Sequence, residues 1–246
     1  MNDNLRERLI LALDVDSERE ALEIVEDLHD LIGYFKIGMQ LYYSVGNSLI
    51  EKIHYLGGKV FLDLKLHDIP NTVQNGARVL ANLGVEMTNF HATGGPQMLK
   101  SASLGLKEAE VEKPPIGIAV TILTSLSKDD LKEIGIKEEV KQSVRNLAIM
   151  TKKAGLAGVV CSPQEIKIVK EACGEDFLTI TPGIRPSWSV KNDQKRITTP
   201  YQAIKDGGDY LVIGRPIRNA ENRREAAKLV LEEMKNGYND YLKGRL

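Results

Sequence analysis

Eight short apolar runs, separated by longer amphipathic segments, limit the fold of this chain more than any other feature of its sequence. The runs are apolar almost throughout, which is typical of parallel strands that are buried on both faces. The predicted strands cover residues 9–15, 34–38, 60–64, 87–91, 116–123, 158–161, 177–181 and 210–213.

Most segments between these strands repeat their apolar residues at helical spacing. Ser17 is a good N-cap for the first of them, because Glu20 follows three residues later as the partner in a capping box. The predicted helices cover residues 18–31, 71–83, 96–109, 138–154, 163–173, 200–206 and 220–235.

Alternating strands and helices predict a parallel sheet of the α/β class. Eight such units in 246 residues suit a (β/α)8 TIM barrel, and we expect one domain over residues 1–246. The alternative is an open doubly wound sheet, but the chain lacks the G-x-G-x-x-G that usually follows the first strand of that fold. We interpret the charged segment 128–139 as a solvated helix face and not as a linker.

The charge balance and the cysteine content exclude several classes of protein. The 33 Lys and Arg residues balance 34 Asp and Glu residues, so there is no basic excess to bind a nucleic acid. With 42% hydrophobic residues the chain is too apolar to be disordered. Cys161 and Cys173 are too few for a disulfide framework. No targeting signal or run of roughly 20 apolar residues occurs, so we expect a cytoplasmic protein without a membrane partner.

Charged residues interrupt the first three predicted strands near their carboxyl ends, where barrels carry their chemistry. These residues are Asp14, Lys36, Asp63 and Lys65. A charge inside a buried strand costs several kcal/mol unless it is paired. We therefore interpret them as a functional group of charges, with a structural ion pair on a loop as the alternative.

Asp63 and Lys65 are two residues apart, so they are expected to project from the same side of a strand. With Lys36 and Asp68 they would form an alternating array of lysines and aspartates that hold one another ionised. A protonated lysine beside a carboxylate suits proton donation to a developing carbanion. It does not suit Schiff-base chemistry, which needs a neutral amine.

The last predicted strand runs into Gly214 and Arg215, and Arg185 and Gln194 precede it in the chain. The loops after strands seven and eight of a barrel often bind phosphate at the start of a short helix. We therefore predict a phosphate site here, with a simple surface role for Arg215 as the alternative.

Two other signals are weaker. His91 and Asp63 could ligate a metal, but no H-x-H or C-x-x-C spacing supports such a site. Ser162 lacks the glycines of a nucleophile elbow, so acyl transfer is not expected.

Residues 63–72 read D-L-K-L-H-D-I-P-N-T and resemble the D-x-K-x-x-D-I-P-N-T motif of the orotidine 5'-phosphate decarboxylases, closest to their bacterial branch. Further segments resemble the same family in order along the chain. They are L-A-L-D-V at 11–15, K-I-G at 36–38, L-T-S at 123–125, T-P-G-I-R at 181–185, D-Q at 193–194 and G-R-P-I at 214–217.

The resemblance implies conversion of orotidine 5'-monophosphate to uridine 5'-monophosphate and CO2, the last step of de novo UMP biosynthesis. It also implies a (β/α)8 homodimer with sites at the subunit interface, and no metal or organic cofactor. Lys65 would protonate C6 of the base, and Asp63 would lie between Lys36 and Lys65 near the substrate carboxylate. Asp68 and Thr72 would reach the substrate bound by the partner subunit.

The same resemblance implies the residues that hold the rest of the substrate. Asp14 and Lys36 would bind the ribose hydroxyls, and Thr124 would contact the pyrimidine. The phosphate would be bound by Gln194, Arg185, Arg215 and the amide of Gly214, and Gln194 would also touch the base.

Two rival hypotheses stay open. The related 3-keto-gulonate 6-phosphate decarboxylase and hexulose-phosphate synthase group shares the D-x-K-x-x-D strand but resembles Mg2+ enzymes with an acidic residue on strand two. Here that strand offers Lys36, which would repel the metal. The second rival is a barrel that binds a nucleotide or phosphosugar without turnover.

Overall fold

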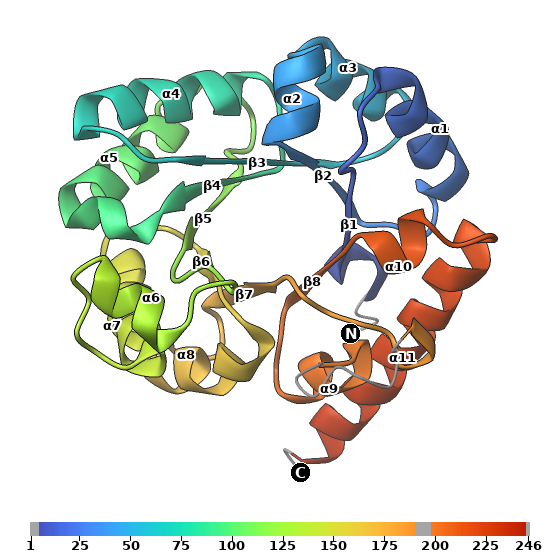
Figure 1. Cartoon of the computed structure of the whole chain (residues 1–246). Coiled ribbons are helices and arrows are strands. Elements are labelled where there is room, and N and C mark those ends of the chain that lie inside the picture. The colour runs from blue at the N-terminus through green and yellow to red at the C-terminus, as the bar shows by residue number, and fades with distance from the viewer. Residues whose placement is uncertain (1–4, 190–197, 245–246) are drawn as a thin grey trace.

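Eight parallel strands close into a barrel in the computed structural model, which describes residues 5–189 and 198–244 (Figure 1). Each strand pairs with the next along the chain, and β8 pairs back with β1. The closed order confirms the predicted (β/α)8 fold and excludes the open doubly wound sheet. The strands are β1 Leu9–Ala12, β2 Tyr34–Gly38, β3 Val60–Leu66, β4 Met87–His91, β5 Ile116–Val120, β6 Gly158–Val160, β7 Leu178–Thr181 and β8 Tyr210–Ile213.

Helices form an outer ring around the barrel (Figure 1). The α-helices are α1 Glu18–Leu28, α2 Met39–Val45, α3 Ser48–Tyr55, α4 Pro70–Asn82, α5 Gly95–Lys107, α6 Lys128–Glu133, α7 Val140–Lys153, α8 Ile166–Cys173, α9 Pro200–Lys205, α10 Arg215–Arg218 and α11 Arg223–Lys243. Short 3-10 helices cover η1 Leu5–Arg8, η2 Ala92–Gly94, η3 Pro163–Glu165 and η4 Ser187–Ser189.

The predicted elements agree with these bounds in most places. The Ser17 side chain accepts a hydrogen bond from the amide of Glu20 and caps α1 as predicted. Two helices, α2 and α3, lie in a segment for which no helix was predicted. α2 buries only Leu41 and shows no apolar period, whereas the helical spacing of Leu49, Ile50 and Ile53 in α3 was a signal that the prediction did not use.

β1 ends before the apolar run that predicted it. Leu13 and Val15 are buried although they lie beyond the strand, at 0% and 5% exposure. Leu13 still donates its amide to the carbonyl of Lys36. Burial therefore explains why the apolar run continues past Ala12, and hydrogen bonding to β2 continues with it as far as Leu13.

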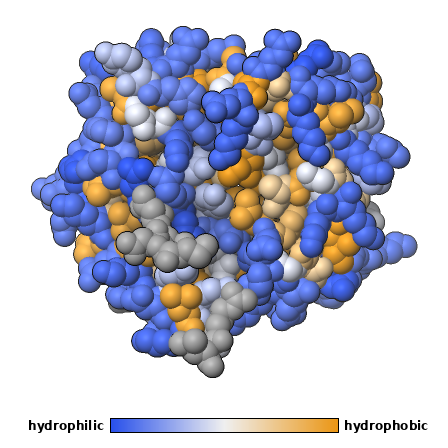
Figure 2. All heavy atoms as spheres, turned by 180° about the vertical axis from the view of Figure 1, so that it is seen from behind, coloured by the Kyte–Doolittle hydropathy of each residue, from blue (hydrophilic) through white to orange (hydrophobic). Residues whose placement is uncertain are grey.

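The core has two layers that account for strands apolar on both faces. Side chains inside the barrel form one layer, from Ile10 and Ala12 on β1 to Val212 on β8. Leu9 and Leu11 point the other way and pack with the helices around the barrel. Charged and polar side chains cover most of the face shown in Figure 2, with smaller apolar areas between them.

β3 departs from a regular strand close to its carboxyl end. Leu62 pairs with Thr88 and Leu66 with Phe90, so four steps along β3 are matched by two along β4. Inside this bulge Lys65 has a φ of 54°, the only positive φ of a non-glycine residue in residues 5–189 and 198–244. Such a conformation costs on the order of 1–3 kcal/mol and persists only where the surroundings enforce it. Asp63 and Lys65 do lie on the same side, as predicted, but at a bulge and not in a regularly alternating strand.

No helix within the described parts of the chain is long and apolar enough to cross a membrane. The assignment of residues 1–246 to one domain stays a prediction.

Candidate active site

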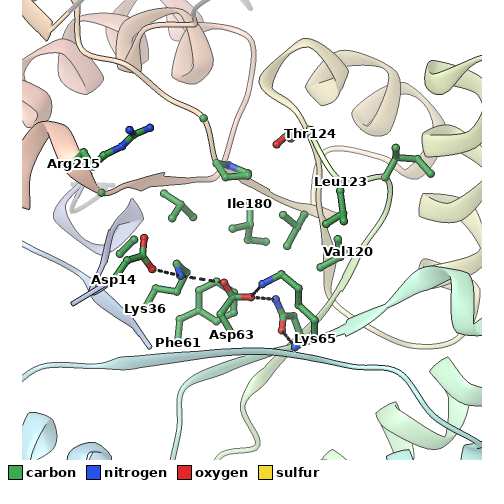
Figure 3. A pocket seen from close by; sticks show the side chains of 18 of the residues that line it. Asp14, Lys36, Phe61, Asp63, Lys65, Val120, Leu123, Thr124, Ile180 and Arg215 are labelled. Carbon is green, nitrogen blue, oxygen red and sulfur yellow. Dashed lines mark hydrogen bonds and ion pairs between the residues drawn. The ribbon is translucent and has the colours of Figure 1, made fainter. Parts of the chain in front are cut away.

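A cavity of 380 Å³ opens at the carboxyl ends of the strands, within the roughly 300–1,000 Å³ typical of small-molecule sites (Figure 3). Phe61, Val120 and Ile180 give it an apolar floor. The predicted site residues that line it are Asp14, Lys36, Asp63, Lys65, Thr124, Arg185, Gly214 and Arg215.

Four charged side chains form a continuous row on one side of this cavity (Figure 3). The Lys36 ammonium lies 3.2 Å from Oδ1 of Asp14 and 3.1 Å from Oδ2 of Asp63. The Lys65 ammonium lies 2.6 Å from Oδ1 of Asp63. Each charge thus has a neighbour of opposite sign, and Asp63 lies between the two lysines.

Asp63 is the most buried carboxylate of the row, with 8% of its surface exposed. Burial alone would raise the pKa of its carboxyl group. The ammonium groups of Lys36 and Lys65, together with hydrogen bonds from Lys65 and Asn89, outweigh that effect and lower the pKa. Asp63 is therefore a buried anion at neutral pH.

The barrel geometry places Lys36 and Asp63 next to each other. Tyr34 and Phe61 point into the barrel, so Lys36 and Asp63, two residues further along β2 and β3, face the same interior. Gly38 leaves room for the lysine, since a β-carbon there would lie 3.3 Å from the Lys36 ammonium nitrogen.

Asn89 on β4 is a site residue that sequence reasoning missed. It is 1% exposed and lines the cavity. Its side-chain oxygen accepts the Lys65 amide at 2.8 Å, and its side-chain nitrogen donates to Oδ1 of Asp63 at 2.6 Å. A polar residue within a buried strand was the available signal, the same one that identified Lys36 and Asp63.

Arg215 lies across the cavity from Lys65 (Figure 3), and Arg185 lines the same cavity. Burial and the nearby charge of Arg215 lower the pKa of Arg185. Gly214 immediately precedes α10, and its backbone lies so close to β1 that a β-carbon would be 3.4 Å from that of Ala12. The cavity thus pairs an arginine side with the Lys/Asp row across an apolar floor, which suits a ligand with an anionic end.

Asp68 and Thr72 do not join this cavity in the single chain. Both are exposed, and Asp68 accepts a hydrogen bond from the following amide, that of Ile69. Of the predicted array, the single chain therefore brings together Lys36, Asp63 and Lys65 without Asp68. Asp14 extends this row beyond Lys36. Gln194 lies outside the described residues.

The weaker candidates have other surroundings. Ser162 caps the helix η3 by accepting the amide of Gln164. Burial, and then the charges of His67 and Lys65, lower the pKa of His91, whose ring lies 5.5 Å from that of His67. Cys161 is fully buried, and burial raises its pKa. Within the part of the chain that the structure describes, no group of three His, Cys, Asp or Glu side chains could hold a metal ion.

A barrel with this cavity has the architecture of an enzyme. The family model described as "Orotidine 5'-phosphate decarboxylase / HUMPS family" matches residues 7–230. An orotidine 5'-phosphate decarboxylase of Syntrophomonas wolfei is 51% identical over 235 residues, which cover 93% of this chain and 98% of the relative. One from Carboxydothermus hydrogenoformans is 50% identical, with 94% and 97% covered.

A solved structure gives the same result. The crystal structure of orotidine 5'-phosphate decarboxylase from Lactobacillus acidophilus matches with a TM-score of 0.83 and 42% identity, over 92% of this chain and 98% of that one. The chain therefore belongs to the orotidine 5'-phosphate decarboxylase / HUMPS family and is an enzyme, a carboxy-lyase. The resemblance seen in the motifs is confirmed.

Replacing Asp63 by asparagine is expected to change how stability depends on pH. The folded-state pKa of Asp63 is lowered, so its charge stabilises the fold above the unfolded-state pKa of about 3.9. That contribution is lost as the pH falls through the folded-state pKa. The free energy of unfolding of the wild type minus that of Asp63→Asn, from urea titrations between about pH 7 and pH 3, should stay constant near neutrality and decrease in acid.

Asp68→Asn, which changes an exposed carboxylate, is the matched control and should follow the wild-type pH dependence. A difference between wild type and Asp63→Asn that stays constant down to about pH 3 would contradict the ion-pair account of Asp63.

Proposed function

We propose that this chain decarboxylates orotidine 5'-monophosphate to uridine 5'-monophosphate and CO2, the last step of de novo UMP biosynthesis, without a metal or organic cofactor. The observation that carries the proposal is the row Lys36–Asp63–Lys65 on one side of a cavity whose other side holds Arg185 and Arg215. Relatives that are half identical in sequence and named orotidine 5'-phosphate decarboxylase support it.

The substrate would lie across the cavity with its phosphate at the arginines. Arg215, Arg185 and the Gly214 amide bind the phosphate, and Gln194 assists them. The ribose hydroxyls bind Asp14 and Lys36, which already form an ion pair with each other. The pyrimidine extends towards Thr124, and its carboxylate meets Asp63.

The reaction breaks the bond between C6 and the carboxylate, and the electron pair stays on C6. The resulting vinyl carbanion has no adjacent π system to delocalise its charge, so preorganised groups must stabilise it. The Lys65 ammonium is placed to do so, and it then transfers a proton to C6 while CO2 leaves. Solvent returns the proton to the lysine amine.

Asp63 contributes through its fixed negative charge. A buried anion beside the substrate carboxylate repels it, and this repulsion fades as the carboxylate becomes neutral CO2. The enzyme would thereby favour the transition state over the bound substrate. Binding energy at the phosphate, remote from C6, offsets the repulsion when the substrate binds.

The Mg2+-dependent rival is disfavoured by the position of Lys36. Its ammonium occupies the space between the carboxylates of Asp14 and Asp63, at 3.2 Å and 3.1 Å. A divalent cation bound by these carboxylates would lie close to that ammonium and be repelled by it. The non-catalytic rival predicts binding without turnover.

The proposal includes a homodimer in the cytoplasm. Asp68, Ile69 and Thr72 project from the barrel, and Ile69 is 66% exposed. An exposed apolar side chain between two polar candidates suits a contact in which Asp68 and Thr72 reach the partner's substrate. The free, buried thiols of Cys161 and Cys173 fit a reducing compartment.

The first test is turnover without metal. The purified protein, treated with EDTA, should convert orotidine 5'-monophosphate to uridine 5'-monophosphate, followed as loss of the orotate absorbance. Absence of both turnover and binding would favour the sugar-phosphate rival, for which Mg2+ would be added next. Tight binding of uridine 5'-monophosphate with no turnover would favour the non-catalytic barrel.

Two substitutions should separate catalysis from binding. Lys65→Ala should lower kcat by roughly 10⁴-fold or more, because it removes the proton donor and the nearest cation, while uridine 5'-monophosphate still binds. Arg215→Ala should lower kcat/KM roughly 100-fold and weaken the binding of uridine 5'-monophosphate, because a charged hydrogen bond to the phosphate is lost. Steady-state kinetics and calorimetric titration give both quantities. Wild-type kcat in Lys65→Ala, or wild-type kcat/KM in Arg215→Ala, would end the respective assignment.

Mixing two inactive variants tests the shared site. In a hybrid dimer of Lys65→Ala and Asp68→Asn, the site with intact Lys65 also receives an intact Asp68 from its partner. Random subunit exchange should therefore restore about a quarter of wild-type activity. The control mixture, Lys65→Ala with Asp63→Asn, should stay inactive because both residues belong to the same chain's site. No recovery in the first mixture after proven exchange would contradict the shared site.

A further inference from the structure

Asn89 connects the two residues to which the chemistry is assigned. Its single amide group contacts the backbone of Lys65 and the carboxylate of Asp63, at 2.8 Å and 2.6 Å. It is also nearly fully buried, at 1% exposure, so water does not compete for these bonds.

The polarity of the amide matches its two partners. The Lys65 N–H can only donate, so it must meet the amide oxygen, and an ionised Asp63 can only accept, so it must meet the amide nitrogen. Asparagine is thus the right length and polarity for both contacts at once. Asn89 itself is held by β4, where it pairs with Ile118 of β5.

The bulge in β3 makes this contact necessary. Between Leu62 and Leu66 the ladder to β4 is interrupted, so the Lys65 amide needs another acceptor. Asn89 provides it, and Lys65 adopts a φ of 54° at the same position. In this conformation the Lys65 ammonium turns back to Asp63, at 2.6 Å.

We propose that Asn89 is a positioning residue, which holds the strained Lys65 backbone and the Asp63 carboxylate in one arrangement so that the ammonium is aimed at the reacting carbon. The inference rests on the proposed decarboxylation. It assigns to Asn89 an effect on kcat and not on phosphate binding, since Arg215 lies across the cavity from Lys65 (Figure 3).

Removal of the amide gives the first test. Asn89→Ala should lower kcat roughly 100-fold, the effect of a displacement of about 1 Å at a reacting group, without a comparable change in the Kd for uridine 5'-monophosphate. Thr88→Val is the matched control. Thr88 is buried on the same strand and donates its hydroxyl to the Leu62 carbonyl of β3, but among the described residues it makes no side-chain hydrogen bond to Asp63 or Lys65. Its kcat should stay at the wild-type value.

Asn89→Asp gives a second test with a pH signature. An ionised carboxylate at position 89 can accept from the Lys65 amide but repels Asp63, so the two acids will share a proton and one pKa of the pair will rise. The protonated form donates to Asp63 as the amide does. Activity of Asn89→Asp should therefore approach the wild type at low pH and fall as the pH rises through the raised pKa.

Other titrating groups near position 89 are common to all variants. Lys65 and Asp63 face it from β3, Lys36 lies beyond Asp63 on β2, and His91 is two residues away on β4, whereas the paired Ile118 on β5 does not titrate. Dividing each profile by that of Thr88→Val removes their contribution.

The possible outcomes test the positioning role of Asn89 separately from the proposed decarboxylation. Wild-type kcat in Asn89→Ala, an equal loss in Thr88→Val, or an Asn89→Asp profile parallel to the wild type would overturn the positioning role. If Asn89→Ala does not fold, Asn89→Asp carries the test, because it keeps the shape of the side chain. Absence of turnover in the wild type would instead contradict the proposed function, and this inference with it.

Discussion

The carboxylate of Asp63, buried between two ammonium groups, is the interaction on which the rest of the site depends. Without Lys36 and Lys65, burial would favour the neutral acid; with them, the pKa is lowered and the charge persists. The anion in turn fixes both lysines at hydrogen-bond distance. A closed barrel makes this possible, because neighbouring parallel strands bring their carboxyl ends to one rim and exclude water below it.

The barrel also keeps the charged row of the cavity apart from its arginine side chains. Strands β1 to β3 supply the charged row, whereas the segments after β7 and β8 supply Arg185, Gly214 and Arg215. Arg215 and Lys65 lie on opposite sides of the cavity (Figure 3), whose floor is apolar. Under the proposed function, an anionic end bound at the arginines would provide binding energy remote from the atom where charge develops.

Sequence reasoning reached most of the fold and much of the site through one argument, that a charge in a buried strand needs a reason. The argument found Lys36, Asp63 and Lys65, and the cavity contains all three. It was not applied to Asn89, a neutral side chain whose buried position marks it in the same way. It also assumed a regular strand, whereas a bulge, stabilised through β4, directs Lys65. Helix α2 was missed because it buries only Leu41, and the helical spacing of Leu49, Ile50 and Ile53 in α3 was not used.

The sequence by itself determined the strand–helix alternation, the closed parallel barrel and the charged residues at its rim, because these follow from local periodicity and from the cost of burying charge. Only the tertiary structure decided which charges meet. Contacts among Asp14, Lys36 and Asp63 depend on the register between β1, β2 and β3, and the direction of Lys65 depends on an amide 24 residues away in the chain. Pairings of this kind join residues far apart in sequence, so no local pattern encodes them.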